Sequence, residues 1–393
     1  FEKMLTMEID LNFKERVFAN LSNAICSIND NNFELDYSEA LKYANAALEI
    51  NPSNIVALNN VGVCKVAMAD FDEAIITLKK ALKLMPDLRP TLKNLVYAYN
   101  HAGLFEKSIE TIEKIESLHP EVITTDMVRA MMLFSLGRFR EGWKYYEFRN
   151  DKKHGSTKDK NLPDFTKPLW TPQLGYKTIL IWAEQGLGDQ ILHGTMLTDF
   201  VKKFNKVILA VDPRLVRFFQ ESFPNTKVFS LFDHIEQDLF DYQIQLTSIG
   251  QYCRNSIDDF LPLKQPYSFS NNSSQNNNLD KKLKCAISWK SMGFKANDKS
   301  ASLESLKKIL KIQQIEFFNI QYTDVDQEVL DFQEKYNIQI KAPPNLDTQN
   351  DIYGLMKFID TCDFVISISN TNAHLSGAIG KPTFILLNNS VGK

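Results

Sequence analysis

One stretch decides the fold: Ile179-Leu-Ile-Trp-Ala-Glu-Gln-Gly-Leu-Gly-Asp-Gln-Ile-Leu-His193. An apolar run typical of a strand ends at Ala183, and an amphipathic segment typical of a helix follows Gly186 and Gly188. We expect the two glycines to allow a tight turn with positive φ. A strand–turn–helix unit of this kind directs backbone N–H groups and one carboxylate, Asp189, at a ligand beside the carboxyl end of a sheet.

The alternation of strands and helices continues on both sides of a polar segment, Ser270-Asn-Asn-Ser-Ser-Gln-Asn-Asn-Asn278. Before it, the pattern predicts strands at 178–184, 206–211, 227–231 and 241–247, with helices at 188–203 and 213–222. After it, the pattern predicts strands at 284–289, 316–321, 338–341, 363–368 and 382–387, with helices at 303–311, 326–336, 350–360 and 372–379. The polar segment cannot bury enough apolar surface to order itself, so we expect a flexible linker there. The sequence therefore predicts an α/β module of two parallel-sheet halves with a ligand-binding cleft between their carboxyl edges.

Composition narrows the class of protein. A chain of 393 residues with 44% apolar residues is expected to form two or three domains with packed cores. The net charge of −3 gives no indication of a nucleic-acid-binding surface. The five scattered cysteines lack metal-ligand spacing, and no apolar run approaches the ~18 residues of a membrane helix, so we expect a cytoplasmic protein without a membrane span. Because the chain starts at Phe1 and stops at Lys393, just past an apolar strand, we expect a fragment whose second half is truncated.

The N-terminal third repeats itself every 34 residues, the spacing of Pro52, Pro86 and Pro120. Between the prolines, small and apolar residues recur in the same register: Gly62 with Val96, Phe71 with Phe105, Ala74 with Ser108, and Ala81 with Ile115. Each unit is expected to form two amphipathic helices, and its proline ends the second helix. The pattern resembles the tetratricopeptide repeat, with about four helix pairs over residues 1–150.

Two asparagines, Asn60 and Asn94, occupy the same position of the first helix in successive repeats. Stacked repeats create extended concave surfaces, and an amide on such a surface can bond the backbone of an extended peptide. We therefore expect the array to bind a protein or peptide acceptor, with these two residues as peptide-binding candidates. The alternative is that this helix position simply favours asparagine.

Motifs along the whole chain resemble one bacterial family, in which tetratricopeptide repeats are fused to a family 9 (heptosyltransferase-like) glycosyltransferase domain. The motifs are Gly142-Trp143, Tyr146-Glu-Phe-Arg149, Trp170, Ala183-Glu-Gln-Gly-Leu-Gly-Asp189, Ile287-Ser-Trp289, Asn297-Asp298 and the segment 363–382. The resemblance implies an all-α repeat array followed by a GT-B-type module of two Rossmann-like halves. A connector (151–176) precedes an acceptor-side half (177–262), and a linker (263–282) precedes a donor-side half (283–393). It also implies a nucleotide-diphosphate-sugar co-substrate and inversion of configuration, with no metal and no other cofactor.

In the first half, the resemblance matches Asp189 to the family's catalytic base. A carboxylate at the mouth of the cleft can take the proton of an acceptor hydroxyl as that hydroxyl attacks the anomeric carbon. The alternative role for Asp189 is to cap the helix that begins near it. His193 either binds the acceptor or packs, and Glu184 is expected to fix the loop geometry. The acceptor-side loop is then formed by Glu184, Gln185, Gly186, Gly188 and His193.

In the second half, the donor site is expected in two loops. Lysines after Trp289 could neutralise a departing diphosphate, or they form a solvated loop. The segment after strand 363–368 opens a helix and predicts an anion site, where His374 is either a ligand or a core histidine bonded to backbone. The donor-binding candidates are Trp289, Lys290, Lys295, Lys299, Ser369, Asn370, Thr371, Asn372 and His374. This chain departs from the family pattern at Ala301, near which relatives carry an arginine, and at Ser369, where they often carry an aspartate.

Three functions fit these patterns. The first is an active glycosyltransferase whose repeats present a protein acceptor. The second is a non-catalytic interaction scaffold with a degenerate sugar-nucleotide fold, which the departures at Ala301 and Ser369 favour. The third is an O-linked N-acetylglucosamine transferase, which shares the same plan of repeats plus GT-B module, but the glycine turn and the C-terminal motif match family 9 instead.

Overall fold

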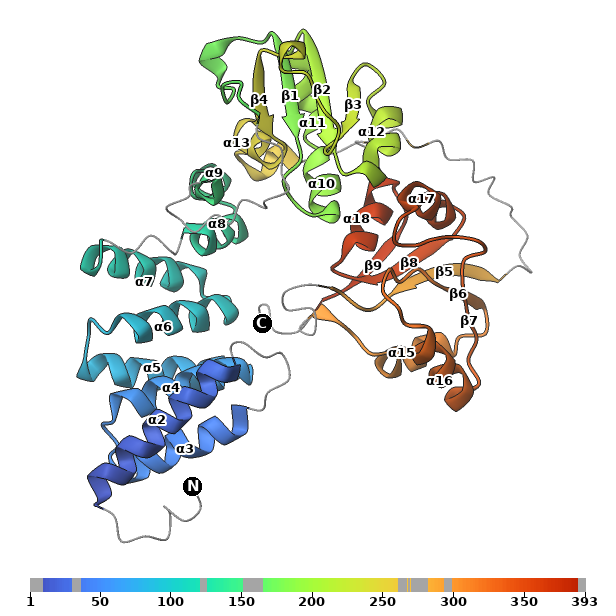
Figure 1. Cartoon of the computed structure of the whole chain (residues 1–393). Coiled ribbons are helices and arrows are strands. Elements are labelled where there is room, and N and C mark those ends of the chain that lie inside the picture. The colour runs from blue at the N-terminus through green and yellow to red at the C-terminus, as the bar shows by residue number, and fades with distance from the viewer. Residues whose placement is uncertain are drawn as a thin grey trace. The chain divides into compact units, whose positions relative to one another are not determined.

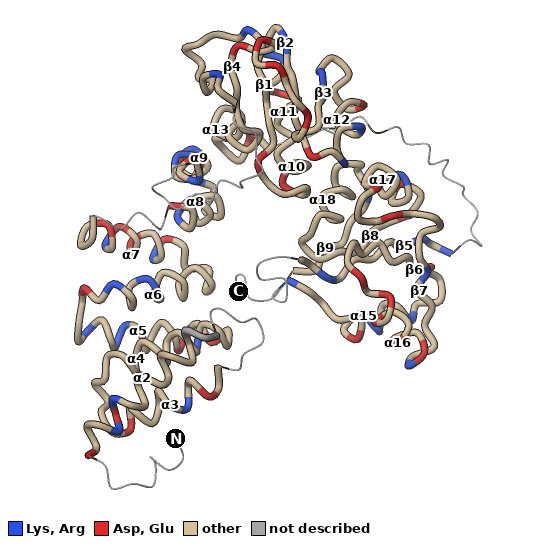
Figure 2. Tube along the Cα trace, viewed as in Figure 1, with Lys and Arg blue, Asp and Glu red and all other residues tan. Residues whose placement is uncertain are grey.

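The computed structural model of the chain describes residues 10–29, 37–120, 126–150, 165–260, 267, 269, 282–292 and 299–387. These residues form two compact units, one within residues 1–156 and the other within 157–388 (Figure 1). The first unit is all-helical and the second contains every described strand. Lys and Arg are interspersed with Asp and Glu along both units (Figure 2).

The first unit is a stack of antiparallel helix pairs, as the 34-residue register predicts. Its helices are α2 (Leu11–Asn29), α3 (Tyr37–Ile50), α4 (Ile55–Ala67), α5 (Phe71–Leu84), α6 (Arg89–His101), α7 (Phe105–Leu118), α8 (Asp126–Ser135) and α9 (Phe139–Tyr146). The small residue at the crossing of α4 and α5 is required there, because a Cβ at Gly62 would lie 2.4 Å from Leu78 Cδ2. Leu78 is fully buried, so the close approach of the two helices forms part of the core of the array.

The turns inside three successive pairs adopt the same left-handed backbone conformation. Ala69 (φ 59°), Gly103 (φ 72°) and Gly137 (φ 72°) occupy equivalent positions after α4, α6 and α8. Two of the three repeats use glycine, which reaches positive φ without a steric cost, whereas alanine pays about 1–2 kcal/mol there. Ala69 is therefore the strained member of the series.

Replacing Ala69 by glycine should stabilise the array by about 1 kcal/mol, because the strain at positive φ exceeds the entropic cost of glycine. For a unit of this size the gain corresponds to a rise of about 2–4 °C in the melting temperature of the array. Ala67→Gly is the matched control. Ala67 is also exposed but is the last residue of α4 and has no positive φ, so glycine there should not stabilise the array. A fall in melting temperature for both variants would show that Ala69 is unstrained.

The second unit begins with a four-stranded parallel sheet in the order β3-β2-β1-β4. The elements of this half are β1 (Thr178–Trp182), α10 (Leu187–Gly194), α11 (Leu197–Phe200), β2 (Lys206–Val211), α12 (Val216–Ser222), β3 (Lys227–Ser230), β4 (Tyr242–Gln245) and α13 (Gly250–Cys253). Strand β1 pairs with both β2 and β4, so the chain order reverses beside β1. Ligands of open α/β sheets bind at such switch points, outside the carboxyl ends of the strands.

A five-stranded parallel sheet in the order β7-β6-β5-β8-β9 forms the other half of the same unit. Its elements are β5 (Leu283–Ser288), α15 (Leu303–Leu310), β6 (Ile315–Asn319), α16 (Asp326–Tyr336), β7 (Ile340–Lys341), α17 (Ile352–Asp360), β8 (Phe364–Ile368), α18 (Thr371–Ala378) and β9 (Thr383–Leu386). The order reverses between β5 and β8, which are the strands that precede the two predicted donor loops. The predicted fold class, a repeat array followed by a module of two Rossmann-like halves, is confirmed.

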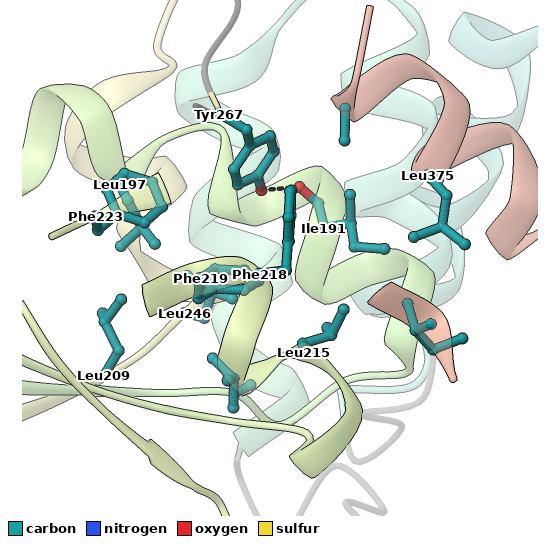
Figure 3. Close-up of a cluster of buried hydrophobic side chains, with 14 of the residues drawn as sticks. Ile191, Leu197, Leu209, Leu215, Phe218, Phe219, Phe223, Leu246, Tyr267 and Leu375 are labelled. Atoms are coloured by element: carbon teal, nitrogen blue, oxygen red, sulfur yellow. Dashed lines mark hydrogen bonds between the residues drawn. The ribbon is translucent and has the colours of Figure 1, made fainter. Parts of the chain in front are cut away.

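One apolar core runs through both halves of the second unit. It joins residues of β1, β2 and α12 to residues of α17 and α18, including Leu375. In Figure 3, Ile191 on α10 lies between Leu375 on α18 and the aromatic side chains of α12, Phe218 and Phe219. Helices α10 and α18 are thus in direct contact, and this contact places the two predicted site motifs next to each other.

The helix predicted at 188–203 is interrupted, which corrects the sequence-based prediction. Helix α10 ends at Gly194, and the chain turns through Thr195 before α11 begins. The carbonyl of Ile191, which a continuing helix would offer to the amide of Thr195, accepts the hydroxyl of Tyr267 instead (Figure 3). A Cβ at Gly194 would lie 2.2 Å from the same hydroxyl. A side chain distant in sequence therefore ends the helix.

Tyr267 also corrects the extent of the flexible linker predicted at 263–282. It is 1% exposed, and Phe269 is buried with it in the shared core. Residues 270–281 lie outside the described residues. The predicted connector behaves similarly at its end, because Trp170 is buried and its amide donates to Gln243 O of β4 at 2.8 Å. Aromatic residues in polar segments thus mark where those segments are anchored.

Candidate active site

The glycine turn after β1 is shaped by close packing rather than by unusual backbone angles. Gly186 precedes α10 with φ −59°, and neither it nor Gly188 is among the described residues with positive φ, so the predicted left-handed turn is wrong. A Cβ at Gly188 would lie 3.0 Å from His374 Cδ2 and 3.4 Å from Thr371 Oγ1. Gly188 is therefore small because the start of α18 packs against it.

This packing brings residues predicted from two distant motifs into one place. Asp189 is exposed in the first turn of α10, and within the described structure its carboxylate makes no hydrogen bond or ion pair. His374 is half-buried beside it on α18. Burial lowers the pKa of His374, and the nearby Asp189 carboxylate opposes that shift. The imidazole is therefore mainly neutral at pH 7 and lies next to an exposed carboxylate.

His374 does not behave as a histidine bonded to backbone inside a core. Neither ring nitrogen forms a hydrogen bond with any residue that the structure describes, and the ring touches Gly188 through its Cδ2 edge. Both nitrogens thus keep their capacity to bind a ligand. This geometry supports the ligand role among the two predicted for His374, which stays a proposal.

The rest of the acceptor-side loop is held by side-chain hydrogen bonds. Glu184 accepts the hydroxyl of Thr247, in keeping with its expected role in fixing loop geometry. Gln190, which the sequence analysis did not single out, donates from Nε2 to Gln185 O at 2.9 Å and accepts Asp212 N at 2.9 Å. Gln190 is buried between this loop and the end of β2, where the backbone groups of Gln185 and Asp212 need a polar partner. This explains why a polar residue stands on the buried face of α10. A glutamine in an otherwise apolar helix position was the available signal.

His193 lies half-buried at the other end of α10, a full turn beyond Asp189. Acceptor binding by His193 stays a prediction.

In the second half, the loop after β5 differs from its prediction. Trp289 is fully buried in the core of this half, and its indole N–H donates to Glu328 at 3.3 Å. Its ring is therefore structural and cannot stack on a donor, which corrects the donor-binding prediction for Trp289. Lys290 is partly exposed but already paired, with 2.5 Å between its Nζ and Glu328 Oε2. Lys299 is exposed, whereas Lys295 lies outside the described residues.

The helix start after β8 shows a second correction. The side chain of Asn370 caps α18 by accepting the amide of Asn372 at 3.0 Å, and its Nδ2 donates to Ser288 Oγ at 2.8 Å. Asn372 is buried, and its Nδ2 donates to Ile320 O at 2.8 Å. The side-chain amides of Asn370 and Asn372 therefore tie the ends of β5, β6 and β8 together. They are not available to bind a nucleotide sugar. Of the five candidates in this segment, Ser369, Thr371 and His374 keep accessible polar groups.

On the repeat array, the two predicted asparagines have different surroundings. Asn60 is 1% exposed, and its Nδ2 donates to the carbonyl of Ala19 in α2 at 3.1 Å. That bond joins α4 to α2 and leaves Asn60 inaccessible to a peptide, which corrects its predicted role. Asn94 is half-buried and donates to Asn59 Oδ1 at 2.9 Å, so it remains near the surface. Tyr97 and Met131, one repeat apart, are 50% and 57% exposed on the first helices of their repeats.

Asn60→Ala should destabilise the array by about 1–3 kcal/mol, because it removes a buried hydrogen bond that joins α4 to α2. Asn94→Ala is the matched control, and its cost should stay below about 1 kcal/mol because its partner is another partly buried side chain. Thermal unfolding of the two variants measures the difference. Equal melting temperatures for the wild type and Asn60→Ala would contradict a structural role for this amide.

Three further observations concern the described structure outside the candidate site. A cavity of about 400 Å³ opens where β5, β6 and β7 begin, at the edge of the sheet opposite the candidate site, and no predicted site residue lines it. Among the described residues, no group of three or more His, Cys, Asp or Glu side chains is placed to hold a metal ion. No helix in the described parts of the chain is long and apolar enough to cross a bilayer.

Comparisons with known proteins agree with the repeat array and extend along the chain. Residues 55–88 match the tetratricopeptide repeat family. Protein FlbA of Caulobacter vibrioides is 27% identical over 394 residues, which cover 93% of this chain and 65% of FlbA, so the chain spans about two thirds of that relative. Two solved structures are similar at low TM-scores. An O-GlcNAc transferase mutant of Thermobaculum terrenum covers 96% of this chain and is itself covered to 83% (TM-score 0.35, 11% identity). MamA of Desulfovibrio magneticus covers 37% and is covered to 77% (TM-score 0.31, 17% identity).

Proposed function

We propose that this protein is an inverting, metal-independent glycosyltransferase that moves a sugar from a nucleotide-diphosphate-sugar to an acceptor. The observation that carries the proposal is the contact of α10 with α18, which places the exposed Asp189 beside His374 at the switch points of two parallel sheets. Open α/β sheets bind ligands at such points, and a donor and an acceptor need facing sites. The sequence motifs that fall here resemble those of glycosyltransferase family 9.

In the proposed reaction, Asp189 is the general base. The acceptor hydroxyl oxygen forms a bond to the anomeric carbon from the face opposite the leaving group. The bond from that carbon to the diphosphate oxygen breaks, and the nucleoside diphosphate leaves with the electron pair. The hydroxyl proton passes to Asp189, whose carboxylate has no competing partner among the described residues. Attack from the opposite face inverts the configuration.

The donor diphosphate is proposed to lie at the start of α18. Ser369, Thr371 and His374 have accessible polar groups there, and the positive end of the helix dipole favours an anion. Lys299 can add charge because it is exposed, and we keep Lys295 as a proposal from the sequence. Lys290 contributes less because Glu328 neutralises it. Asn370 and Asn372 act only by shaping the helix start.

The acceptor is proposed to be a protein or peptide held by the repeat array. Tetratricopeptide-type stacks offer extended surfaces, and Tyr97 and Met131 expose apolar area at equivalent positions of successive repeats. Asn94 lies on the same first helix as Tyr97 and keeps its predicted role, whereas Asn60 does not. A cytoplasmic location stays part of the proposal, because the five cysteines are scattered along the sequence and lack metal-ligand spacing.

The alternative function, a non-catalytic interaction scaffold, is favoured by one set of observations. Donor groups expected in the second half are occupied, since Asn370 and Asn372 bond inside the fold and Lys290 pairs with Glu328. The departures at Ala301 and Ser369 point the same way. This alternative predicts a repeat array that binds a partner without any turnover of nucleotide sugar.

A panel of nucleotide sugars tests the proposal. Their nucleotides are the diphosphates of uridine, guanosine, cytidine, adenosine and thymidine. Calorimetry measures binding, and a coupled assay measures release of the nucleoside diphosphate, since water can replace the acceptor slowly. The proposal expects the protein to bind the sugars of one nucleotide and to release that nucleoside diphosphate slowly. UDP-N-acetylglucosamine belongs in the panel, because its turnover would support the O-linked N-acetylglucosamine alternative. Binding without release, or no binding at all, would favour the scaffold.

A further inference from the structure

A buried glutamine at the carboxyl end of β6 clamps the start of the loop after β5. Gln321 is 3% exposed, and its Oε1 accepts Ser288 Oγ at 3.1 Å and the amides of Trp289 and Lys290 at 3.0 Å each. Its Nε2 donates to the carbonyl of Lys290 at 2.9 Å. One side chain thus bonds both backbone groups of Lys290, much as a neighbouring strand would.

Gln321 is itself held in place from both sides. Its amide donates to Asn319 Oδ1 at 2.8 Å, and its carbonyl accepts Thr348 Oγ1 at 2.8 Å. The carbonyl of Lys290 receives a second donor, Asn370 Nδ2, at 3.2 Å. The same backbone group is therefore fixed by β6 through Gln321 and by the start of α18 through Asn370.

The loop that follows is closed at its base. Ala301 N donates to Trp289 O at 2.8 Å, and Ser291 N donates to Ser300 Oγ at 3.0 Å. The described ends of this loop, 290–292 and 299–301, are thus held together at one point, and they include Lys290 and Lys299. Gln321 sets the position of that point relative to α18.

We propose that Gln321 is a positioning residue for the donor side: by holding both backbone groups of Lys290, it fixes the start of the donor loop, residues 290–292, against the start of α18. The inference rests on the proposed function only for its consequence, nucleotide binding. Gln321 does not touch the donor itself. Its effect passes through the loop, so its loss should weaken donor binding beyond any effect on stability.

Gln321→Met tests the proposal, because methionine keeps the length of the side chain but removes all four hydrogen bonds. Gln243→Met is the matched control. Gln243 is also buried and bonds backbone carbonyls at Phe165 and Lys167, at 2.6 and 2.8 Å, but it lies in the first half, away from the donor loop. We expect similar falls in melting temperature for both variants. Only Gln321→Met should raise the dissociation constant of the best-binding nucleoside diphosphate, by about tenfold, the equivalent of one good contact to a charged group.

Hydrogen exchange gives a readout that does not depend on the proposed function. The amides of Trp289 and Lys290 should exchange faster in Gln321→Met than in the wild type or in Gln243→Met. If the wild type binds no nucleoside diphosphate, the proposed function fails, and exchange alone decides the clamp. Unchanged exchange at Trp289 and Lys290, or equal nucleotide affinity in the two variants, overturns the proposal. If Gln321→Met does not fold, Gln321→Asn replaces it, since asparagine stays polar but is one methylene too short to keep the four hydrogen bonds, and the same outcomes apply.

Discussion

Asp189→Asn is expected to lower turnover of the nucleotide sugar by about 10²–10⁴-fold, the usual contribution of a general base. The carboxylate is exposed in the first turn of α10 and has no partner among the described residues, so its removal breaks no contact inside the fold. Asparagine cannot accept the acceptor proton. The lost charge at the helix start costs only about 0.3–1 kcal/mol of stability. Turnover, nucleotide affinity and melting temperature are measured on the same preparation.

The control for this variant is Asp258→Asn, which removes another exposed carboxylate from the same half of the module. It should leave turnover unchanged, because Asp258 lies in a short 3-10 helix far along the chain from the glycine turn. Full activity in Asp189→Asn would refute the base assignment. A collapsed melting temperature would instead show that Asp189 acts by capping α10.

His374→Ala is expected to weaken binding of the nucleoside diphosphate by about tenfold or more, because a hydrogen bond to a charged group is worth about 1.5–3 kcal/mol. Burial lowers the pKa of this histidine, so the free protein holds it neutral near pH 7. A bound diphosphate favours the charged form. Affinity should therefore rise as the pH falls through the range where the imidazole gains its proton, and the variant should lack this part of the pH dependence. Calorimetry at several pH values measures the affinity of both proteins for the nucleotide. The titration of the nucleotide is the same for both, so it cancels in the comparison.

His234→Ala is the matched control, because His234 is an exposed histidine of the first half that lies beside Glu236. It should change neither affinity nor its pH dependence. If His374→Ala binds as tightly as the wild type but melts at a lower temperature, His374 serves only to pack against Gly188.

The sequence predicted the elements of this fold well because their signals are local. The 34-residue register identifies the helix pairs, and Ala69, Gly103 and Gly137 share one backbone conformation because they share one place in that register. Apolar runs predict the strands, because a strand that is buried on both faces consists mainly of apolar residues. Asp189 and His374 belong to separate motifs, each at the switch point of one sheet. The contact of α10 with α18 brings the two residues together.

What the sequence did not predict depends on partners distant along the chain. Helix α10 ends early because Tyr267 takes the carbonyl of Ile191, and nothing near Gly194 signals this. Polar residues such as Asn60, Asn372 and Gln321 look like surface or ligand groups in a sequence, yet each is buried and bonds the backbone of another element. A polar side chain reveals its partner only when the fold brings the two together, so predictions of which amides bind a ligand were the weakest.

The central claim, sugar transfer from a nucleotide-diphosphate-sugar with Asp189 as the base, is tested most directly by the rate of nucleoside diphosphate release. The measurement compares the wild type with Asp189→Asn at a saturating concentration of the nucleotide sugar that binds in calorimetry. The account predicts release by the wild type, a rate lower by about 10²–10⁴-fold in Asp189→Asn, and equal nucleotide affinity in both. Release at equal rates by the two proteins, or no release from any nucleotide sugar of the panel, would contradict it.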